Sequence, residues 1–134
     1  MARPKPAPPL ASPDDIERLM AVWSDDEEIS CVHPGGPRVV GAGAIRAAFE
    51  SIFANGAVNA HPEKVRRLQT LSCSVHSVLE HIRLMTPEGL QSAWVVATNV
   101  YLKTAQGWRL VSHHASPGSP REVQELVEAA STLH

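Results

Sequence analysis

The chain has 134 residues, 43% of them hydrophobic, and a formal net charge of −2. This length and composition suit one globular domain with a real core. The sequence shows neither a basic stripe nor an apolar run of membrane-spanning length, so we expect no nucleic-acid and no membrane partner. Cys31 and Cys73 lie far apart without a CxxC motif, which is typical of free thiols in a reducing cytoplasm, and we expect a cytoplasmic protein.

The first twelve residues contain four prolines, so they are predicted to form a proline-rich tail and not a helix. Ser12 is a good N-cap and Pro13 suits the first helical position, which predicts a helix starting there. Apolar residues then follow the spacing of one buried helical face. They are Ile16, Leu19, Met20 and Trp23.

A short strand is predicted over residues 29–33, ended by the turn residues Pro34-Gly-Gly-Pro37. A second helix is predicted from Gly43 to Phe53, because apolar residues recur there at helical spacing. Residues 55–62 are expected to form a loop, and residues 65–71 a further strand.

Three long antiparallel strands are predicted over residues 73–86, 94–103 and 108–115, because apolar and β-branched residues alternate there between turn signals. Side chains alternate faces along a strand, so Asn99 and Tyr101 share one face. His113 and His114 must point to opposite sides. One of these two histidines is expected to face the space that the sheet encloses.

Ser119-Pro-Arg-Glu122 forms a capping box, which predicts a last helix over about residues 120–132. The order of elements, with His33-Pro-Gly-Gly36 after the first strand and His113-His-Ala-Ser-Pro117 at the end of the last strand, resembles the nuclear transport factor 2-like superfamily. The closest resemblance is to SnoaL-like bacterial domains and to the association domain of calcium/calmodulin-dependent protein kinase.

This resemblance implies an α+β fold: a cystatin-like cone in which a curved antiparallel sheet wraps around helices and encloses a pocket. It also implies a homodimer formed through the sheet. We therefore expect a proline-rich tail at residues 1–12, a cone domain at residues 13–118 and an extra helix at residues 119–134. The family's usual first helix is missing, and the last helix is expected to cover that surface in the same subunit or in its partner.

The resemblance also suggests the site. Ketosteroid isomerase-like relatives place an acidic general base at the position that matches His33 and an oxyanion donor at the position that matches Asn99. His113 is expected beside Asn99, which makes these three the candidate catalytic residues. The expected ligand-binding residues are Trp23, Arg83, Tyr101 and Met85.

Each site residue also has a purely structural interpretation. His33 could hold its turn through backbone hydrogen bonds, Asn99 could be a paired buried amide, and Arg83 could pair with an acid. His33, His81 and His113 together would suit zinc, but their spacing has no metal-binding signature, so no metal and no cofactor are expected.

Two functions remain open. The first is a SnoaL-like protein that carries out proton transfer of the isomerase, cyclase or dehydratase type on a small apolar substrate. The second is a non-catalytic module of the kinase-association type, which binds a carboxylate-bearing ligand or forms oligomers. Whether the protein is an enzyme is left open by the sequence.

Overall fold

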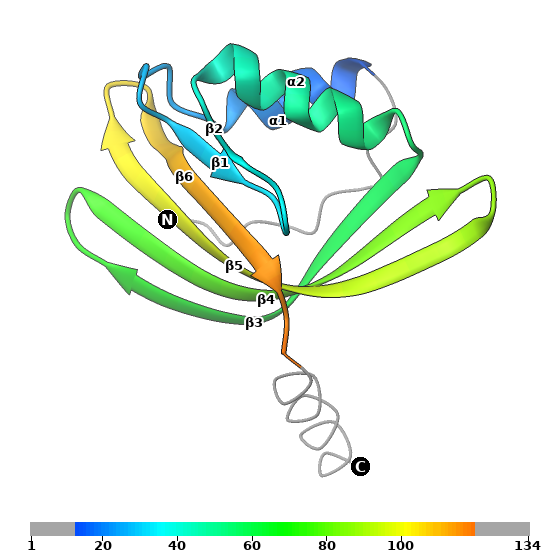
Figure 1. Ribbon diagram of the computed structural model, residues 1–134. Helices are drawn as coiled ribbons and strands as arrows, with labels where there is room; N and C mark the ends of the chain where they lie inside the picture. Colours follow the sequence, from blue (N-terminus) through cyan, green and yellow to red (C-terminus); the bar gives the residue numbers. More distant parts are fainter. Residues whose placement is uncertain (1–12, 120–134) are drawn as a thin grey trace, which may run out of the picture.

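The computed structural model describes residues 13–119. In chain order its elements are α1 (Pro13–Ala21), β1 (Ser30–Val32), β2 (Arg38–Val40), α2 (Ala42–Phe53), β3 (Ala57–Gln69), β4 (Cys73–Thr86), β5 (Gly89–Thr104) and β6 (Gly107–Pro117). The strands form one sheet in the order β2-β1-β6-β5-β4-β3. Figure 1 shows that this sheet is strongly curved and that both helices lie across its concave face. The predicted α+β fold with a curved sheet is confirmed.

The sheet is a meander from β3 to β6, in which each consecutive pair of strands is antiparallel. Strand β1 joins the far edge of β6 in parallel and pairs with β2 on its other side. The parallel pair brings a segment near residue 31 beside one near residue 113. That apposition of distant segments creates the site described below.

The prediction of a loop over residues 55–62 is wrong, because β3 already starts at Ala57 and pairs there with Met85 of β4. Pro62 lies where the register between the two strands shifts. Proline has no backbone N–H group to donate. Because β3 is an edge strand and Pro62 lies at a bulge, the sheet loses no hydrogen bond that it needs. The predicted tail at residues 1–12 and the predicted helix over residues 120–132 lie outside the described residues.

Gly56 links α2 to β3 and has a φ of 144°. Residues other than glycine rarely adopt this backbone conformation. A Cβ at this position would also collide with the backbone carbonyl oxygen of Met85. The tight entry into β3 therefore requires glycine.

The core lies between the helices and the short strands. Ile16 of α1 is buried, as predicted for the apolar face of the first helix. Trp23 is also buried, but it lies beyond the end of α1 at Ala21. The largest buried cluster consists of Trp23, Ile29, Cys31, Ile45 and Leu110. Burying a large aliphatic side chain contributes about 1.5–3 kcal/mol, so this cluster fixes β1 and α2 against β6. No helix within residues 13–119 has the length and hydropathy needed to cross a membrane.

Candidate functional site

A row of polar side chains crosses the concave face. In register, His76 of β4 lies opposite Asn99 of β5, Asn99 opposite His113 of β6, and His113 opposite Cys31 of β1. Residues paired in this way point to the same side of a sheet. We call these four residues the interior row. The structure therefore brings Asn99 and His113 together, as predicted, and His114 on the opposite face is exposed.

The side chains of His113 and Asn99 are hydrogen-bonded, with 2.5 Å between His113 Nδ1 and Asn99 Oδ1. The amide oxygen can only accept, so Nδ1 of the imidazole is the donor. This contact leaves the lone pair of His113 on Nε2. It also directs the Asn99 amide NH₂ group away from His113.

His33 follows β1 directly and lies beside the interior row. Its ring centroid is 6.0 Å from that of His113 and 4.8 Å from that of Phe49, which it meets edge to face. Its Nε2 atom is 3.7 Å from the sulfur of Cys31. His33 is thus placed with Asn99 and His113, so all three predicted catalytic residues gather in one region.

Burial decides the charge state of this region. It lowers the pKa of His113 from 6.5 to about 4, with smaller contributions from His33 and His114. Burial also lowers the pKa of His33. Both imidazoles are therefore neutral at neutral pH and offer a lone pair. Burial raises the pKa of the Cys31 thiol to about 11, so in this state it is not a nucleophile.

The interior row continues toward Tyr101, which was predicted to line the pocket. The rings of Tyr101 and His76 lie 4.8 Å apart, and burial, followed by the charge of Glu80, raises the pKa of the phenol. Within residues 13–119, the buried atoms His76 Nε2 and Ser74 Oγ have no hydrogen-bond partner. Sequence reasoning overlooked His76, although its alternation with Val78 and Glu80 in β4 was visible.

Arg83 and Met85 do not lie with the other predicted ligand-binding residues. In β4 they have the opposite parity to His76 and Glu80, so they point to the convex face. Both are exposed. His81 shares that face and stacks on Trp94 at 4.5 Å between ring centroids, so it cannot join His33 and His113 around a metal ion.

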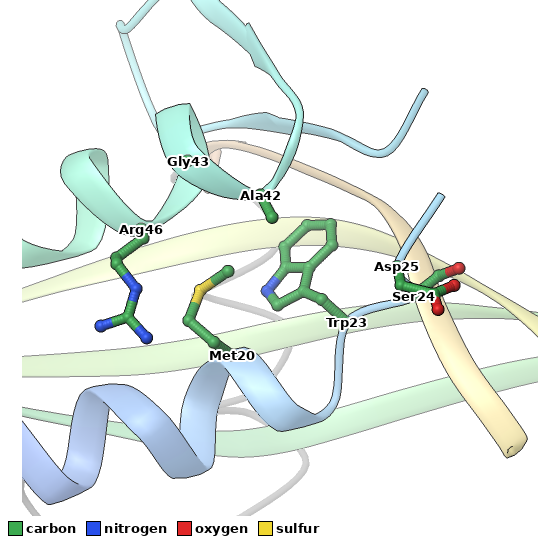
Figure 2. Close-up of a pocket in the computed structure, with 7 residues that line it drawn as sticks. All are labelled: Met20, Trp23, Ser24, Asp25, Ala42, Gly43 and Arg46. Carbon is green, nitrogen blue, oxygen red and sulfur yellow. The ribbon is translucent and has the colours of Figure 1, made fainter. Parts of the chain in front are cut away.

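Trp23 lines a separate pocket of about 270 Å³ between the end of α1 and the start of α2. Figure 2 shows its indole between the Met20 side chain and Ala42. Its buried Nε1 atom has no hydrogen-bond partner within the described part of the chain. The pocket is lined by Met20, Trp23, Ser24, Asp25, Ala42, Gly43 and Arg46, and thus by none of the candidate catalytic residues.

One group of residues in the described part of the chain offers closely spaced metal ligands, namely Cys31, His33 and His113. One ligand atom from each lies within 4.8 Å of the other two. Two of the three belong to the predicted catalytic set, and Cys31 was noted in the sequence only as a free thiol. The approach of Cys31 to His113 depends on the parallel pairing of β1 with β6, which local sequence patterns do not predict.

A family model described as a SnoaL-like domain matches residues 10–120. A crystal structure described as a "putative dehydratase from the NTF2-like family", from Streptomyces avermitilis, is 32% identical to the chain. Its TM-score is 0.71, and the match covers 78% of this chain and 83% of that one.

A "putative calcium/calmodulin-dependent protein kinase type II association domain" from Thiobacillus denitrificans is 29% identical, with a TM-score of 0.65 and coverage of 84% and 100%. An NTF2-like protein with a cystatin-like fold from Novosphingobium aromaticivorans is 18% identical. Its TM-score is 0.64, with coverage of 84% of this chain and 75% of that one, and it supports the fold alone. No curated protein matches the chain.

Proposed function

Because the chain belongs to the SnoaL-like domain family, we propose that it catalyses cofactor-independent proton transfer on a small apolar carbonyl compound, of the isomerase or dehydratase type. The observation that carries this proposal is the hydrogen bond between His113 and Asn99 on the concave face, with a neutral His33 next to it. This arrangement combines an acceptor for a proton with a donor for a developing negative charge.

In the proposed reaction, the neutral imidazole of His33 removes a proton from the carbon next to the carbonyl group. The electron pair of the broken C–H bond moves onto the carbonyl oxygen and forms an enolate. The Asn99 NH₂ group donates to that oxygen, which is the position where charge develops. The protonated His33 then returns its proton, either to another carbon, which completes an isomerisation, or to a leaving hydroxyl group, which completes a dehydration.

His113 has a positioning role in this scheme. Its Nδ1–H group donates to Asn99 Oδ1, so the amide is held with its NH₂ group available to the substrate. A fixed donor costs no reorganisation when the charge appears, which is why it stabilises a transition state better than a mobile one. The Streptomyces avermitilis relative supports this class of chemistry through the activity given in its description.

The test uses ring opening of a nitrobenzisoxazole by the chelator-treated protein, because this reaction needs only a base in an apolar site and releases a coloured phenolate. We expect saturable catalysis above the buffer rate. His33→Gln should lower kcat/KM by about 10²–10⁴-fold, the usual contribution of a general base. His114→Gln is the matched control, since His114 is exposed on the other face, and its rate should equal that of the wild type.

The pH profile gives a second readout. Burial lowers the pKa of His33, so the rate should reach half of its plateau below pH 6.5. A rate equal to that of free imidazole, or an unchanged rate in His33→Gln, would refute the proposal.

A binding and assembly function is the second candidate, favoured by the similarity to the Thiobacillus denitrificans association domain. On the convex face, Leu68, Val75 and Val100 lie in one row across β3, β4 and β5. Leu68 is 73% exposed, and an apolar row of this kind suits the sheet of a second copy of the chain.

Light scattering after gel filtration tests this candidate. The wild type should be a dimer, and Leu68→Lys should be a monomer. Leu71→Lys is the control, because Leu71 is exposed in the β3–β4 turn outside the row. A monomeric wild type, or a Leu68→Lys variant that is still dimeric, would contradict assembly through this face.

A further inference from the structure

The three candidate metal ligands come from the neighbouring parallel strands β1 and β6 and from the residue that directly follows β1. Cys31 is in the middle of β1 and lies in register with His113 of β6. His33 follows β1 directly, two residues after Cys31, and its Nε2 atom is 3.7 Å from the Cys31 sulfur. A Cys-x-His pair at the end of β1 therefore meets a histidine from the next strand, and the three ligand atoms lie within 4.8 Å of one another.

These distances are close to those of a tetrahedral zinc site. Zinc binds thiolate sulfur at about 2.3 Å and imidazole nitrogen at about 2.0–2.1 Å, which sets neighbouring tetrahedral ligands roughly 3.3–3.7 Å apart. The Cys31 sulfur and His33 Nε2 are already 3.7 Å apart. A side-chain movement of about 1 Å would bring the most widely separated pair of ligand atoms into this range.

The neighbours of the cluster also suit a metal site. A histidine that binds a metal ion usually donates its other ring N–H to an oxygen acceptor, which fixes the tautomer. His113 already does so, because its Nδ1 atom is bound to Asn99 Oδ1 at 2.5 Å. The nitrogen left for a metal ion is Nε2, and the orienting contact exists before any ion arrives.

The chemical nature of the three groups selects the ion. One sulfur and two imidazole nitrogens favour zinc and similar borderline-soft cations, whereas magnesium and calcium prefer oxygen. The cluster lies against apolar surroundings: Cys31 is fully buried in the core with Ile29 and Ile45, and His33 packs on Phe49. Such surroundings keep competing water away from the sulfur.

We propose that Cys31, His33 and His113 form a zinc-binding site, in which Asn99 orients His113 and a fourth coordination position remains open to water or a ligand. Three protein ligands and one open position are the arrangement of catalytic and not of structural zinc sites. The inference goes beyond the proposed proton transfer and does not depend on it. Zinc occupies the same nitrogen lone pairs, so the zinc-bound and metal-free proteins are alternative states of one site.

Cobalt(II) is the probe, because it replaces zinc in tetrahedral sites and is coloured. Full-length protein, reduced and freed of metal by a chelator, is titrated with cobalt(II) and then with zinc. We expect one equivalent of cobalt to give intense visible bands of a tetrahedral complex and a near-ultraviolet band of thiolate-to-cobalt charge transfer. One equivalent of zinc should bleach both.

Matched variants assign the ligands. The chain has only two cysteines, so a charge-transfer band that persists in Cys73→Ser and disappears in Cys31→Ser identifies Cys31. His113→Gln should weaken cobalt binding about 100-fold or more, whereas His114→Gln should bind like the wild type. Asn99→Ala should weaken binding about 10–100-fold, as expected when the partner that orients a ligand is lost.

Several results would overturn the proposal: a colourless wild type, a spectrum without a charge-transfer band, or equal binding by His113→Gln and His114→Gln. If Cys31→Ser fails to fold, the Cys73→Ser protein alone still decides, because its charge-transfer band can come only from Cys31. The proton-transfer proposal is tested in the presence of chelator, so failure of either proposal leaves the other test intact.

Discussion

Acidification should unfold this protein partly through one residue, His113. Burial lowers the pKa of His113 from 6.5 to about 4 in the folded state. Between these pH values the His113 imidazole is therefore protonated in the unfolded chain and neutral in the folded chain. The free energy of unfolding therefore has its full value above pH 6.5 and decreases as the pH falls toward 4. Each pKa unit corresponds to about 1.4 kcal/mol, so the loss at pH 4 reaches about 3 kcal/mol.

The variant His113→Gln isolates this contribution. At pH 7 it should be about 1 kcal/mol less stable than the wild type, because it alters the hydrogen bond to Asn99. At pH 4 the variant lacks this imidazole and its unfavourable titration, so it should be more stable than the wild type by about 2 kcal/mol. The two stability curves should therefore cross between pH 4 and pH 6.5.

Urea unfolding followed by tryptophan fluorescence, with chelator present, measures both curves. The other buried titrating groups change the slope for both proteins alike: the pKa values of His33 and His76 are lowered by burial, and that of Glu80 is raised by burial, with the opposite effect on stability. His114→Gln is the control and should follow the wild type closely, because His114 contributes least to the lowered pKa of His113. Parallel curves for the wild type and His113→Gln would refute the reasoning.

Three further substitutions test the packing and the site. Ile45→Ala should cost about 2–5 kcal/mol in urea unfolding, because Ile45 is fully buried in the main cluster; a cost below 1 kcal/mol would contradict this packing. Gly56→Ala should lower the melting temperature, since its φ of 144° and the nearby Met85 carbonyl oxygen exclude a Cβ, whereas Gly43→Ala, in open space within α2, should not. Asn99→Ala should lower kcat for the benzisoxazole more than it changes KM. The opposite result would show that Asn99 does not stabilise the transition state.

Most of the fold could be predicted from the sequence because its signals are local. Alternation identified the strands from residue 73 onward, and turn residues such as Gly89 and Gly107 separated them. The missed parts were the short strand β2, the start of β5 and the first half of β3. Pro62 and Gly56 are turn residues by type, and only the edge position of the strand explains why β3 continues through Pro62.

The site was harder to predict, because it depends on long-range pairing. Alternation shows which residues of a strand share a face, but it does not say which face is concave. Arg83 was assigned to the ligand site from the family resemblance, although the register places it on the face opposite to that of Asn99. The approach of Cys31 to His113 needs the parallel β1–β6 pair, and nothing in either segment alone predicts it.

A β-bulge decides which of the two adjacent histidines serves the site. The turn pairs Thr104 with Gly107, and an uninterrupted ladder from there would place Ser112 opposite Asn99. The register shifts by one residue between Val100 and Tyr101, so His113 takes that position. One extra residue in β6 thus exchanges the faces of all residues beyond it. Without the shift His113 would point to the convex face, and both its hydrogen bond to Asn99 and its place beside Cys31 would be lost. The proposed proton transfer and the proposed zinc site therefore depend on the same irregularity.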